Sequence, residues 1–255
     1  DGKVAFTGGV NLADEYANEI TRFGHWKDTA IMLKGDAVQS FTMLFLEMWA
    51  VNQMEPADCQ NYLTPKHVVP DPPHGYVIPY GDHPYDNENV GEEVYFHILN
   101  HSKKYVHIMT PYLILDSEMI TALTRAAKSG IEVIIIMPHI PDKWYAFVLA
   151  HTYYKELIQA GVSIYEYTPG FVHAKVFVSD DDTATVGTIN LDYRSLYLHF
   201  ECGAYIYDHP VVADIEQDFQ ETLKKCQKIS LTEVENRPVT YKVMGQILRL
   251  IAPLM

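Results

Sequence analysis

Residues 171–190 read FVHAKVFVSDDDTATVGTIN, and this stretch decides how the rest of the chain is interpreted. Polar His173 and Lys175 alternate with apolar Ala174 and are followed by the apolar run Val176–Val178, which together are typical of a strand. Residues two apart on a strand point to the same face, so we expect the side chains of His173 and Lys175 to project together. An imidazole beside an ammonium group can bind a phosphate, and a histidine placed there can attack phosphorus or protonate a leaving oxygen.

The second half of the stretch supplies neutral donors. A tight turn at Gly187 and Thr188 can bring a backbone N–H, a hydroxyl and the amide of Asn190 beside the imidazole and the ammonium group. Such donors favour phosphate oxygens, where negative charge accumulates. Asp180, five residues after Lys175, completes the spacing His-x-Lys-x4-Asp-x6-Gly-Thr-x-Asn.

Part of this pattern occurs twice in the chain. Residues 1–12 match residues 180–191 at an offset of 179, and residues 28–38 match residues 201–211 at an offset of 173. Two matches in the same order indicate a duplication. The offset places the first copy's histidine and lysine upstream of Asp1, so we expect this chain to begin inside the first copy.

The remaining pattern predicts an α/β fold. Short β-rich runs alternate with segments of helical periodicity, and such alternation predicts a mixed β-sheet flanked by helices. We therefore expect one complete unit and one truncated first unit. The predicted parts are the rest of the first unit (1–54), a linker (55–89) with one edge strand near Tyr76–Ile78, the second unit (90–231) and a helical tail (232–255). The expected strands are 105–109, 131–137 and 162–167, and the expected helices are 36–52, 117–129, 142–159 and 210–227.

Composition narrows the function classes. The formal net charge of -14, without a long Lys/Arg run, argues against a nucleic-acid partner. No apolar run is long enough to span a bilayer, so this chain itself is expected to be soluble. The three cysteines are far apart and are interpreted as reduced thiols facing a cytosol. The twelve histidines show no metal-ligand spacing, so neither a metal nor a cofactor is predicted.

The complete motif resembles the signature of the phospholipase D superfamily, and its surroundings resemble bacterial cardiolipin synthases. Thr188 stands where serine is commoner and keeps the hydroxyl. The residues that carry the resemblance are 1–2, 6–11, 14–16, 26–29, 110–112, 173–180, 186–195, 200–201 and 252–254.

The resemblance implies a metal-free phosphatidyl transfer through a phosphohistidine. Two phosphatidylglycerol molecules would give cardiolipin and glycerol. The absent first-copy histidine would be the nucleophile, and His173 the general acid/base. The implied catalytic residues are His173, Lys175, Asp180, Asn190 and Glu201, and the implied substrate-binding residues are Gly187, Thr188, Asn11 and Asp28.

Within this set, several roles follow from the resemblance. Lys175 and Asn190 would hold phosphate oxygens, and Asp180 would be structural or would tune the site. Glu201 and Asp28 occupy matching places in the two copies, and each is expected to orient an imidazole. The sequence leaves open which carboxylate serves which histidine.

Two alternatives remain open at the sequence level. One is a phospholipase D-like phosphodiesterase or nuclease that completes its site across a homodimer. The other is an inactive piece that lacks the first histidine and lysine. Loss of the first copy's strand would expose a sheet edge that invites a homodimer. The full-length protein is expected at the bacterial cytoplasmic membrane, with its surface and phosphatidylglycerol as partners. The apolar tail Val239–Met255 is predicted to pack on its own domain, with a membrane surface as the alternative.

Overall fold

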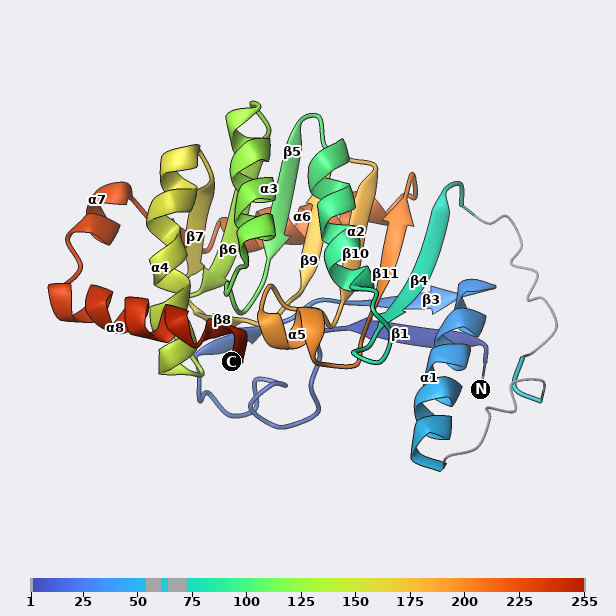
Figure 1. Cartoon of the computed structure of the whole chain (residues 1–255). Helices are drawn as coiled ribbons and strands as arrows, with labels where there is room; N and C mark the ends of the chain where they lie inside the picture. Colours follow the sequence, from blue (N-terminus) through green and yellow to red (C-terminus); the bar gives the residue numbers. More distant parts are fainter. Residues whose placement is uncertain (1, 54–60, 64–72, 255) are drawn as a thin grey trace.

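An eight-stranded sheet forms the centre of the chain in a computed structural model that describes residues 2–53, 61–63 and 73–254 (Figure 1). The three strands β5, β6 and β7 run parallel, and the other neighbouring pairs are antiparallel. The mixed sheet predicted from the sequence is thus confirmed. In sheet order the strands are β12 (Cys226–Lys228), β7 (Ser163–Tyr167), β6 (Glu132–Pro138), β5 (Tyr105–Met109), β9 (Val176–Ser179), β10 (Thr183–Gly187), β11 (Glu201–Tyr207) and β4 (Tyr76–Asp82).

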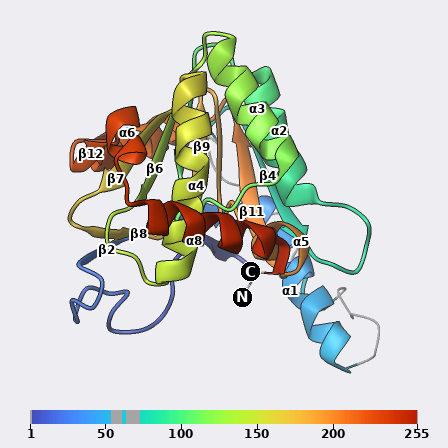
Figure 2. The same ribbon diagram turned by 60° about the vertical axis from the view of Figure 1, so that its left-hand side comes forward.

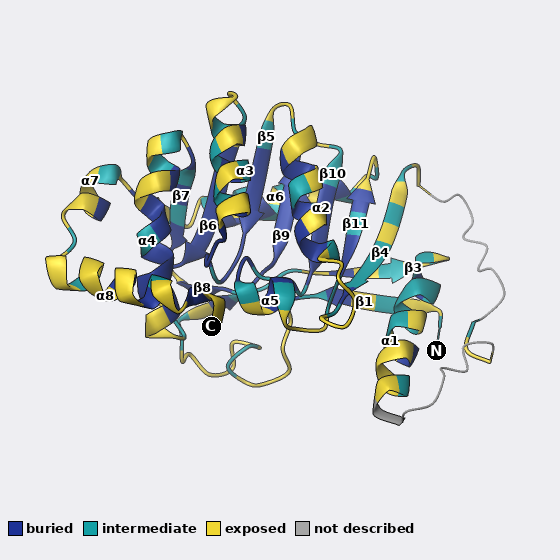
Figure 3. Cartoon of the chain, in the orientation of Figure 1, coloured by how far each residue is buried: buried dark blue, intermediate teal, exposed yellow. Residues whose placement is uncertain are grey.

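Helices cover both faces of this sheet. The helices α2 (Val90–His101), α3 (Ser117–Lys128) and α4 (Trp144–Ala160) lie on one face, and α6 (Val211–Leu223) lies on the other (Figure 1). Side chains of the central strands are buried on both faces (Figure 3), which explains why runs such as Val133–Met137 are apolar throughout.

The first unit repeats part of the geometry of the second. Its strands β1 (Val4–Gly8) and β3 (Ala30–Lys34) pair antiparallel and are followed by α1 (Ala37–Gln53). Gly8 pairs with Ala30, and Gly187 of β10 pairs with Gly203 of β11, so the two registers differ by the offsets 179 and 173 found in the sequence. This shared register supports the duplication.

The two strand pairs differ in their neighbours: among the described residues β11 also pairs with β4, whereas β3 pairs only with β1. Within the described part of the chain, β10 lies between two strands, whereas β1 pairs only with β3. Among the described residues, β1 therefore has one edge without a strand partner.

The remaining segments join the units or cover them. Strand β2 (His25–Lys27) of the first unit pairs parallel with β8 (Gly170–Val172) of the second. The linker prediction overlaps β4, which is a full member of the large sheet, while residues 54–60 and 64–72 lie outside the described part.

The tail packs on its own domain, as predicted. After α7 (Leu231–Glu235), helix α8 (Val239–Leu250) crosses α4, and the 3-10 turn η1 (Ala252–Leu254) contacts α5 (Tyr193–Tyr197) (Figure 2). None of the described helices combines the length and the hydropathy needed to cross a bilayer.

Candidate functional site

His173 lies between β8 and β9, at the end of the molecule where the parallel strands finish (lower end in Figure 1). Its Nδ1 is 2.8 Å from Oδ2 of Asp28, which the first unit supplies. The backbone N–H of His173 donates to the carbonyl of Lys27 at 2.7 Å, which extends the β2–β8 pairing. Rings of Trp26 and Phe171 pack beside the imidazole, at centroid distances of 4.9 and 6.1 Å. The imidazole is therefore fixed by residues from both units.

The position of Asp28 is also fixed. The N–H of Thr29 donates to Oδ1 at 2.9 Å, which leaves Oδ2 for the imidazole. The chain at Gly9 passes so close that a Cβ there would lie 2.3 Å from Oδ1 of Asp28 and 2.7 Å from the His173 carbonyl. Only glycine permits this approach. Of the two carboxylates that the sequence left open, Asp28 is the one that contacts His173.

Lys175 is almost completely buried behind His173. Its Nζ donates to the carbonyl of His173. Burial lowers the pKa of Lys175 to about 7, although the nearby carboxylates of Asp28, Glu201 and Asp192 oppose this effect. Near neutral pH the amine of Lys175 can therefore be either charged or neutral.

Thr188 and Glu201 meet across the β10–β11 hairpin. The Thr188 hydroxyl donates to the Glu201 carboxylate, and its oxygen accepts the N–H of Cys202 at 3.0 Å. A Cβ on Gly187 would lie 2.5 Å from the Cys202 carbonyl, so a glycine is needed for the strands to approach here. Burial raises the pKa of Glu201, and hydrogen bonds from Thr188 and Ser195 partly offset this rise.

Asn190 contacts Ser195, which carries part of the resemblance but was assigned no role from the sequence. Its Nδ2 donates to the hydroxyl oxygen of Ser195 at 3.0 Å, while its Oδ1 is buried without a protein partner. Asp192 accepts the N–H of Ser195 at 2.7 Å and thereby begins α5. An aspartate three residues before a serine is the only sequence signal for this contact, because it predicts a helix N-terminus that presents the serine.

The two carboxylates from the repeat occupy unequal surroundings. Asp28 contacts His173 directly, whereas Glu201 contacts the Thr188 hydroxyl. The histidine recorded beside Glu201 in the described part of the chain is His199, whose Nδ1 lies 3.6 Å from Oε1 and whose side chain is half exposed. Of the two carboxylates, Asp28 therefore has the shorter contact with an imidazole, 2.8 Å against 3.6 Å for Glu201.

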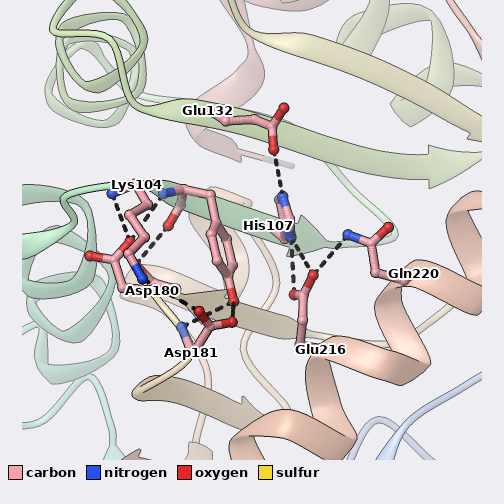
Figure 4. A network of polar contacts seen from close by, with 9 residues as sticks. Lys104, His107, Glu132, Asp180, Asp181, Glu216 and Gln220 are labelled. Carbon is pink, nitrogen blue, oxygen red and sulfur yellow. Dashed lines mark hydrogen bonds and ion pairs between the residues drawn. The ribbon is translucent and has the colours of Figure 1, made fainter.

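Asp180 is not brought to His173, contrary to the grouping expected from the motif. Asp180 follows the last residue of β9, whereas Lys175 precedes the first, so the four residues of this strand separate them along the sheet. There its carboxylate accepts the backbone N–H groups of Lys103, Lys104 and Tyr105 at 2.5, 2.8 and 3.0 Å (Figure 4). This geometry supports the structural role for Asp180.

Asn11 lies near Gly9, which packs against Asp28, but Asn11 itself is exposed. It follows Gly9 by two residues and precedes the loop that leads to β2. The structure thus groups His173, Lys175 and Asp28 around one point, with Thr188, Glu201 and Asn190 joined through the hairpin. The catalytic and binding roles of these residues remain predictions.

A second polar group, around His107, lies away from this site. His107 is buried on β5, with Nδ1 3.0 Å from Glu216 and Nε2 3.4 Å from Glu132 (Figure 4). Its ring stacks on Phe219 at 4.6 Å, so this group joins α6 to the sheet. Across the described residues, no cluster of three or more His, Cys, Asp or Glu side chains has metal-site geometry.

Comparison with known proteins identifies a matching family model and similar sequences. A family model described as "Cardiolipin synthase, PLD-like domain" matches residues 95–223. The whole chain is similar to an uncharacterized protein of Streptococcus mutans (55% identical, 55% of that protein covered). It is also similar to a cardiolipin synthase of Geobacillus kaustophilus (35%, 51% covered) and to cardiolipin synthase 2 of Bacillus anthracis (36%, 49% covered). The chain therefore spans about half the length of the curated relatives it matches.

Solved structures show the same fold at low sequence identity. Phosphatidylserine synthase of Haemophilus influenzae aligns with the whole chain and 69% of its own, with a TM-score of 0.76 and 14% identity. A phospholipase D family member of Salmonella typhimurium aligns over 61% of this chain and 99% of its own, with a TM-score of 0.51 and 16% identity. The fold predicted from the motif is thereby confirmed.

Proposed function

This chain belongs to the cardiolipin synthase family of phospholipase D-like proteins, and we propose that its His173 site transfers a phosphatidyl group between two alcohols. The observation that carries the proposal is the 2.8 Å contact between His173 and Asp28, with the buried Lys175 behind the imidazole. A histidine with a purely structural role does not require a buried amine beside it. A phosphate-binding site, in contrast, uses both an imidazole and an amine.

The contact with Asp28 supports Nε2 as the nitrogen of His173 that would react. In the tautomer that donates Nδ1–H to the carboxylate, Nε2 carries the lone pair and can accept a proton from an alcohol. When Nε2 is protonated, the same carboxylate stabilises the imidazolium. His173 is therefore suited to act as a general acid and then as a general base.

Lys175 and Asn190 would bind the phosphate oxygens. A phosphodiester brings negative charge to Lys175 and would favour its ammonium form over the neutral amine. Asn190 holds a hydrogen bond to Ser195 through its amide nitrogen, which fixes the orientation of the side chain. Thr188 would hold Glu201 in place rather than contact substrate, since its hydroxyl donates to that carboxylate.

The proposed reaction needs a second histidine beside Glu201, supplied by the first copy of the motif. Its nitrogen forms a bond to phosphorus, the bond from phosphorus to the leaving glycerol oxygen breaks, and His173 gives its Nε2 proton to that oxygen. The hydroxyl of the acceptor lipid then returns a proton to His173 and bonds to phosphorus, and the phosphorus–nitrogen bond breaks. With phosphatidylglycerol as donor and acceptor, the products are glycerol and cardiolipin.

The substrate assignment rests on the named relatives and on charge. The cardiolipin synthases among them match this chain along its whole length. The net charge of -14 disfavours a polyanion such as DNA as substrate. A membrane phospholipid therefore fits better than a nucleic acid, and the protein would work at the bacterial cytoplasmic membrane.

The test is phosphatidyl transfer by the protein that contains this chain, followed as glycerol release and cardiolipin formation. His173→Ala should abolish turnover, and Asp28→Asn should lower kcat by about 10²-fold or more because the imidazolium loses its carboxylate. Asp14→Asn changes an exposed acid in the neighbouring loop and should leave the rate unchanged. Glycerol release that persists at the normal rate in His173→Ala would refute the proposal.

A second measurement concerns the 255-residue chain alone. If two chains combine their histidines, specific activity should rise with protein concentration, and His199→Ala should have no effect. If the chain needs the first copy of the motif, it should be inactive until a polypeptide with that copy is added. Cleavage of DNA without glycerol release would instead favour a nuclease.

A further inference from the structure

A pocket of about 180 Å³ lies where α7 and α8 pack against α4, at the left of the molecule in Figure 1. Helix α4 supplies His151 and Lys155 to its lining, α7 supplies Glu235, and α8 supplies Lys242. The segment that joins α7 to α8 adds Arg237. The lining shares no residue with the group around His173, so this pocket is a separate feature of the fold.

The lining is positively charged, although the chain as a whole is acidic, with a net charge of -14. Lys155, Arg237 and Lys242 are its cations, and Glu235 is its carboxylate. Glu235 pairs with Nζ of Lys155 at 3.0 Å, whereas Lys242 donates to the backbone carbonyl of Glu235 at 2.6 Å. One carboxylate thus faces three cations, and this excess of positive charge favours an anion in the pocket.

Arg237 is the cation that the surrounding side chains hold in place. Its guanidinium lies over the rings of Tyr154 and Tyr241, at 5.5 and 5.8 Å from their centroids. Its Nη1 is buried and has no hydrogen-bond partner in the part of the chain that the structure describes. A buried donor without an acceptor is destabilising, so an acceptor supplied by a ligand would stabilise this group.

Glu166, the carboxylate that Arg237 approaches, is already occupied by other donors. Its Oε1 lies 3.1 Å from Nε2 of His151, and its Oε2 lies 2.9 Å from Nδ1 of His139. The Tyr154 hydroxyl donates to Oε1 at 3.4 Å. Arg237 lies 4.0 Å from the same oxygen, which is the longest of these contacts. The charge of the guanidinium is therefore only partly balanced within the protein.

We propose that this pocket binds a soluble phosphate or phosphate monoester, at a site separate from the one that contains His173. A phosphate monoester carries about 1.5–2 negative charges at neutral pH and three strong acceptor oxygens, which suits three cations that share one carboxylate. Arginine binds phosphate through two parallel N–H bonds, and such a pair would give Nη1 of Arg237 an acceptor. The pocket is smaller than the roughly 300–1,000 Å³ of sites for drug-sized ligands, so the ligand has to be small.

A bound phosphate would also connect three parts of the fold. Lys155 belongs to α4, Lys242 belongs to α8, and Arg237 lies between α7 and α8. A ligand that binds only the folded state raises the midpoint of thermal unfolding. Phosphate should therefore raise the Tm of the chain, and it should slow amide hydrogen exchange in α7 and α8 more than in α2, which is remote from the pocket.

The first experiment is titration calorimetry of the chain with inorganic phosphate and with glycerol 3-phosphate. Tighter binding of the ester identifies an ester as the preferred source of the phosphate, and equal or weaker binding identifies free phosphate. His173→Ala should retain the binding, because the pocket and the His173 site share no residue. Binding needs no turnover, so an inactive protein would count against the proposed function alone. Loss of binding in His173→Ala, or no binding by the unmodified chain, would overturn the phosphate pocket.

Two matched pairs of substitutions locate the bound phosphate. Lys155→Gln/Lys242→Gln removes two exposed cations from the lining and should weaken binding by about tenfold or more. Lys128→Gln/Lys224→Gln removes two exposed cations at the ends of α3 and α6 and should leave the affinity unchanged. Circular dichroism verifies that the variants are folded. An equal loss in both pairs would show that only the net charge matters, and the pocket would be refuted.

Arg237 has a counterpart that is suitable as a control. Arg249 lies over the ring of Tyr153 at 4.5 Å and 4.0 Å from Glu156, but it does not line the pocket. Arg237→Gln should abolish most of the rise in Tm caused by phosphate, whereas Arg249→Gln should retain it. The same rise in both variants would mean that phosphate does not bind the guanidinium of Arg237.

The last variant should increase the affinity. Glu235→Gln removes the carboxylate that competes for Lys155, so phosphate should bind severalfold more tightly than it does to the unmodified chain. This gain cannot result from partial unfolding, which only weakens binding. Unchanged or weaker binding by folded Glu235→Gln would contradict the proposed site.

Discussion

Lys175 shows how burial turns an ordinary surface cation into a group that titrates near neutral pH. Its pKa is lowered to about 7 by burial, from 10.5. Between these values the unfolded chain binds the proton and the folded chain does not, so the free energy of unfolding gains from this group as pH rises. Below pH 7 both states are protonated, and the full penalty of burying the charge remains.

We predict that Lys175→Met removes this pH dependence. Relative to the variant, the unmodified protein should gain up to about 1.4 kcal/mol of unfolding free energy per pH unit between pH 7 and 10. Urea unfolding at several pH values measures the difference. Parallel curves for the two proteins would show that Lys175 keeps an ordinary pKa. Bound phosphodiester should reduce the difference, because it favours the ammonium form.

At the scale of an element, Asp180 holds the turn between α2 and β5 by accepting three backbone N–H groups. Its φ of 56° lies in the left-handed region, which aspartate and asparagine tolerate better than alanine. We predict that Asp180→Ala lowers the unfolding free energy by about 1–2 kcal/mol, and Asp180→Asn by less, since the amide oxygen still accepts.

The rate of the chemical step distinguishes this role from a catalytic one. Measured on folded protein below the unfolding transition, kcat of Asp180→Asn should equal that of the unmodified enzyme. A large fall in kcat without a fall in stability would show that the residue acts on the site from a distance.

Three helices meet at a shared pair of carboxylates. The Tyr197 hydroxyl of α5 lies 2.9 Å from both oxygens of Glu92 on α2 and 2.5 Å from Asp116, which begins α3. Burial, and then the hydrogen bond with Asp116, raise the pKa of Glu92 to about 8. The folded state thus retains a proton that the unfolded state releases near pH 4.5, and this contribution to stability is lost as pH rises toward 8.

Glu92→Gln should remove the loss of stability with rising pH, because a neutral amide needs no proton. We predict that the variant is less sensitive to pH, and that above pH 8 it is more stable than the unmodified protein by on the order of 1 kcal/mol. Thermal unfolding at pH 5 and pH 9 provides the comparison. A variant that is destabilised equally at both values would indicate that the hydrogen-bond geometry, not the charge, matters at this junction.

At the scale of the whole molecule, Trp26 connects the first unit to the second. Its buried ring stacks on Phe171 at 4.6 Å and packs beside His173. Lys27 adds an ion pair to Asp218 of α6 at 2.8 Å. These contacts hold Asp28, the following residue, against the imidazole.

We predict that Trp26→Ala lowers the unfolding free energy by about 3–5 kcal/mol through the cavity it leaves. Amide hydrogen exchange of residues 25–29 should accelerate more than exchange in the central strands, because the β2–β8 pairing opens locally. Lys27→Ala removes the ion pair but not the ring, and should cost about 1 kcal/mol or less. If both variants exchange alike, the aromatic stack does not control this junction.

The sequence alone determined the motif and the bounds of several helices and strands. The 3.6-residue and two-residue periodicities depend only on neighbours along the chain, so α3, α4 and the parallel strands were placed within a few residues of their observed bounds. The duplication was also visible, and its offsets predict the paired registers of β1–β3 and β10–β11. Helix α2 and the full length of β4 were missed, because their surroundings rich in Pro, His and Asp masked the periodicity.

Tertiary structure decided which residues meet. Asp28 lies 145 residues before His173, and nothing local could show that it, rather than Glu201, contacts this imidazole. A strand of four residues separates Asp180 from Lys175, so a motif that is continuous in sequence is divided between two ends of a sheet. Ser195 contacts Asn190 because Asp192 caps α5 and accepts the N–H of Ser195. Sequence patterns record local geometry, whereas contacts across strands and units depend on how the whole chain closes on its core.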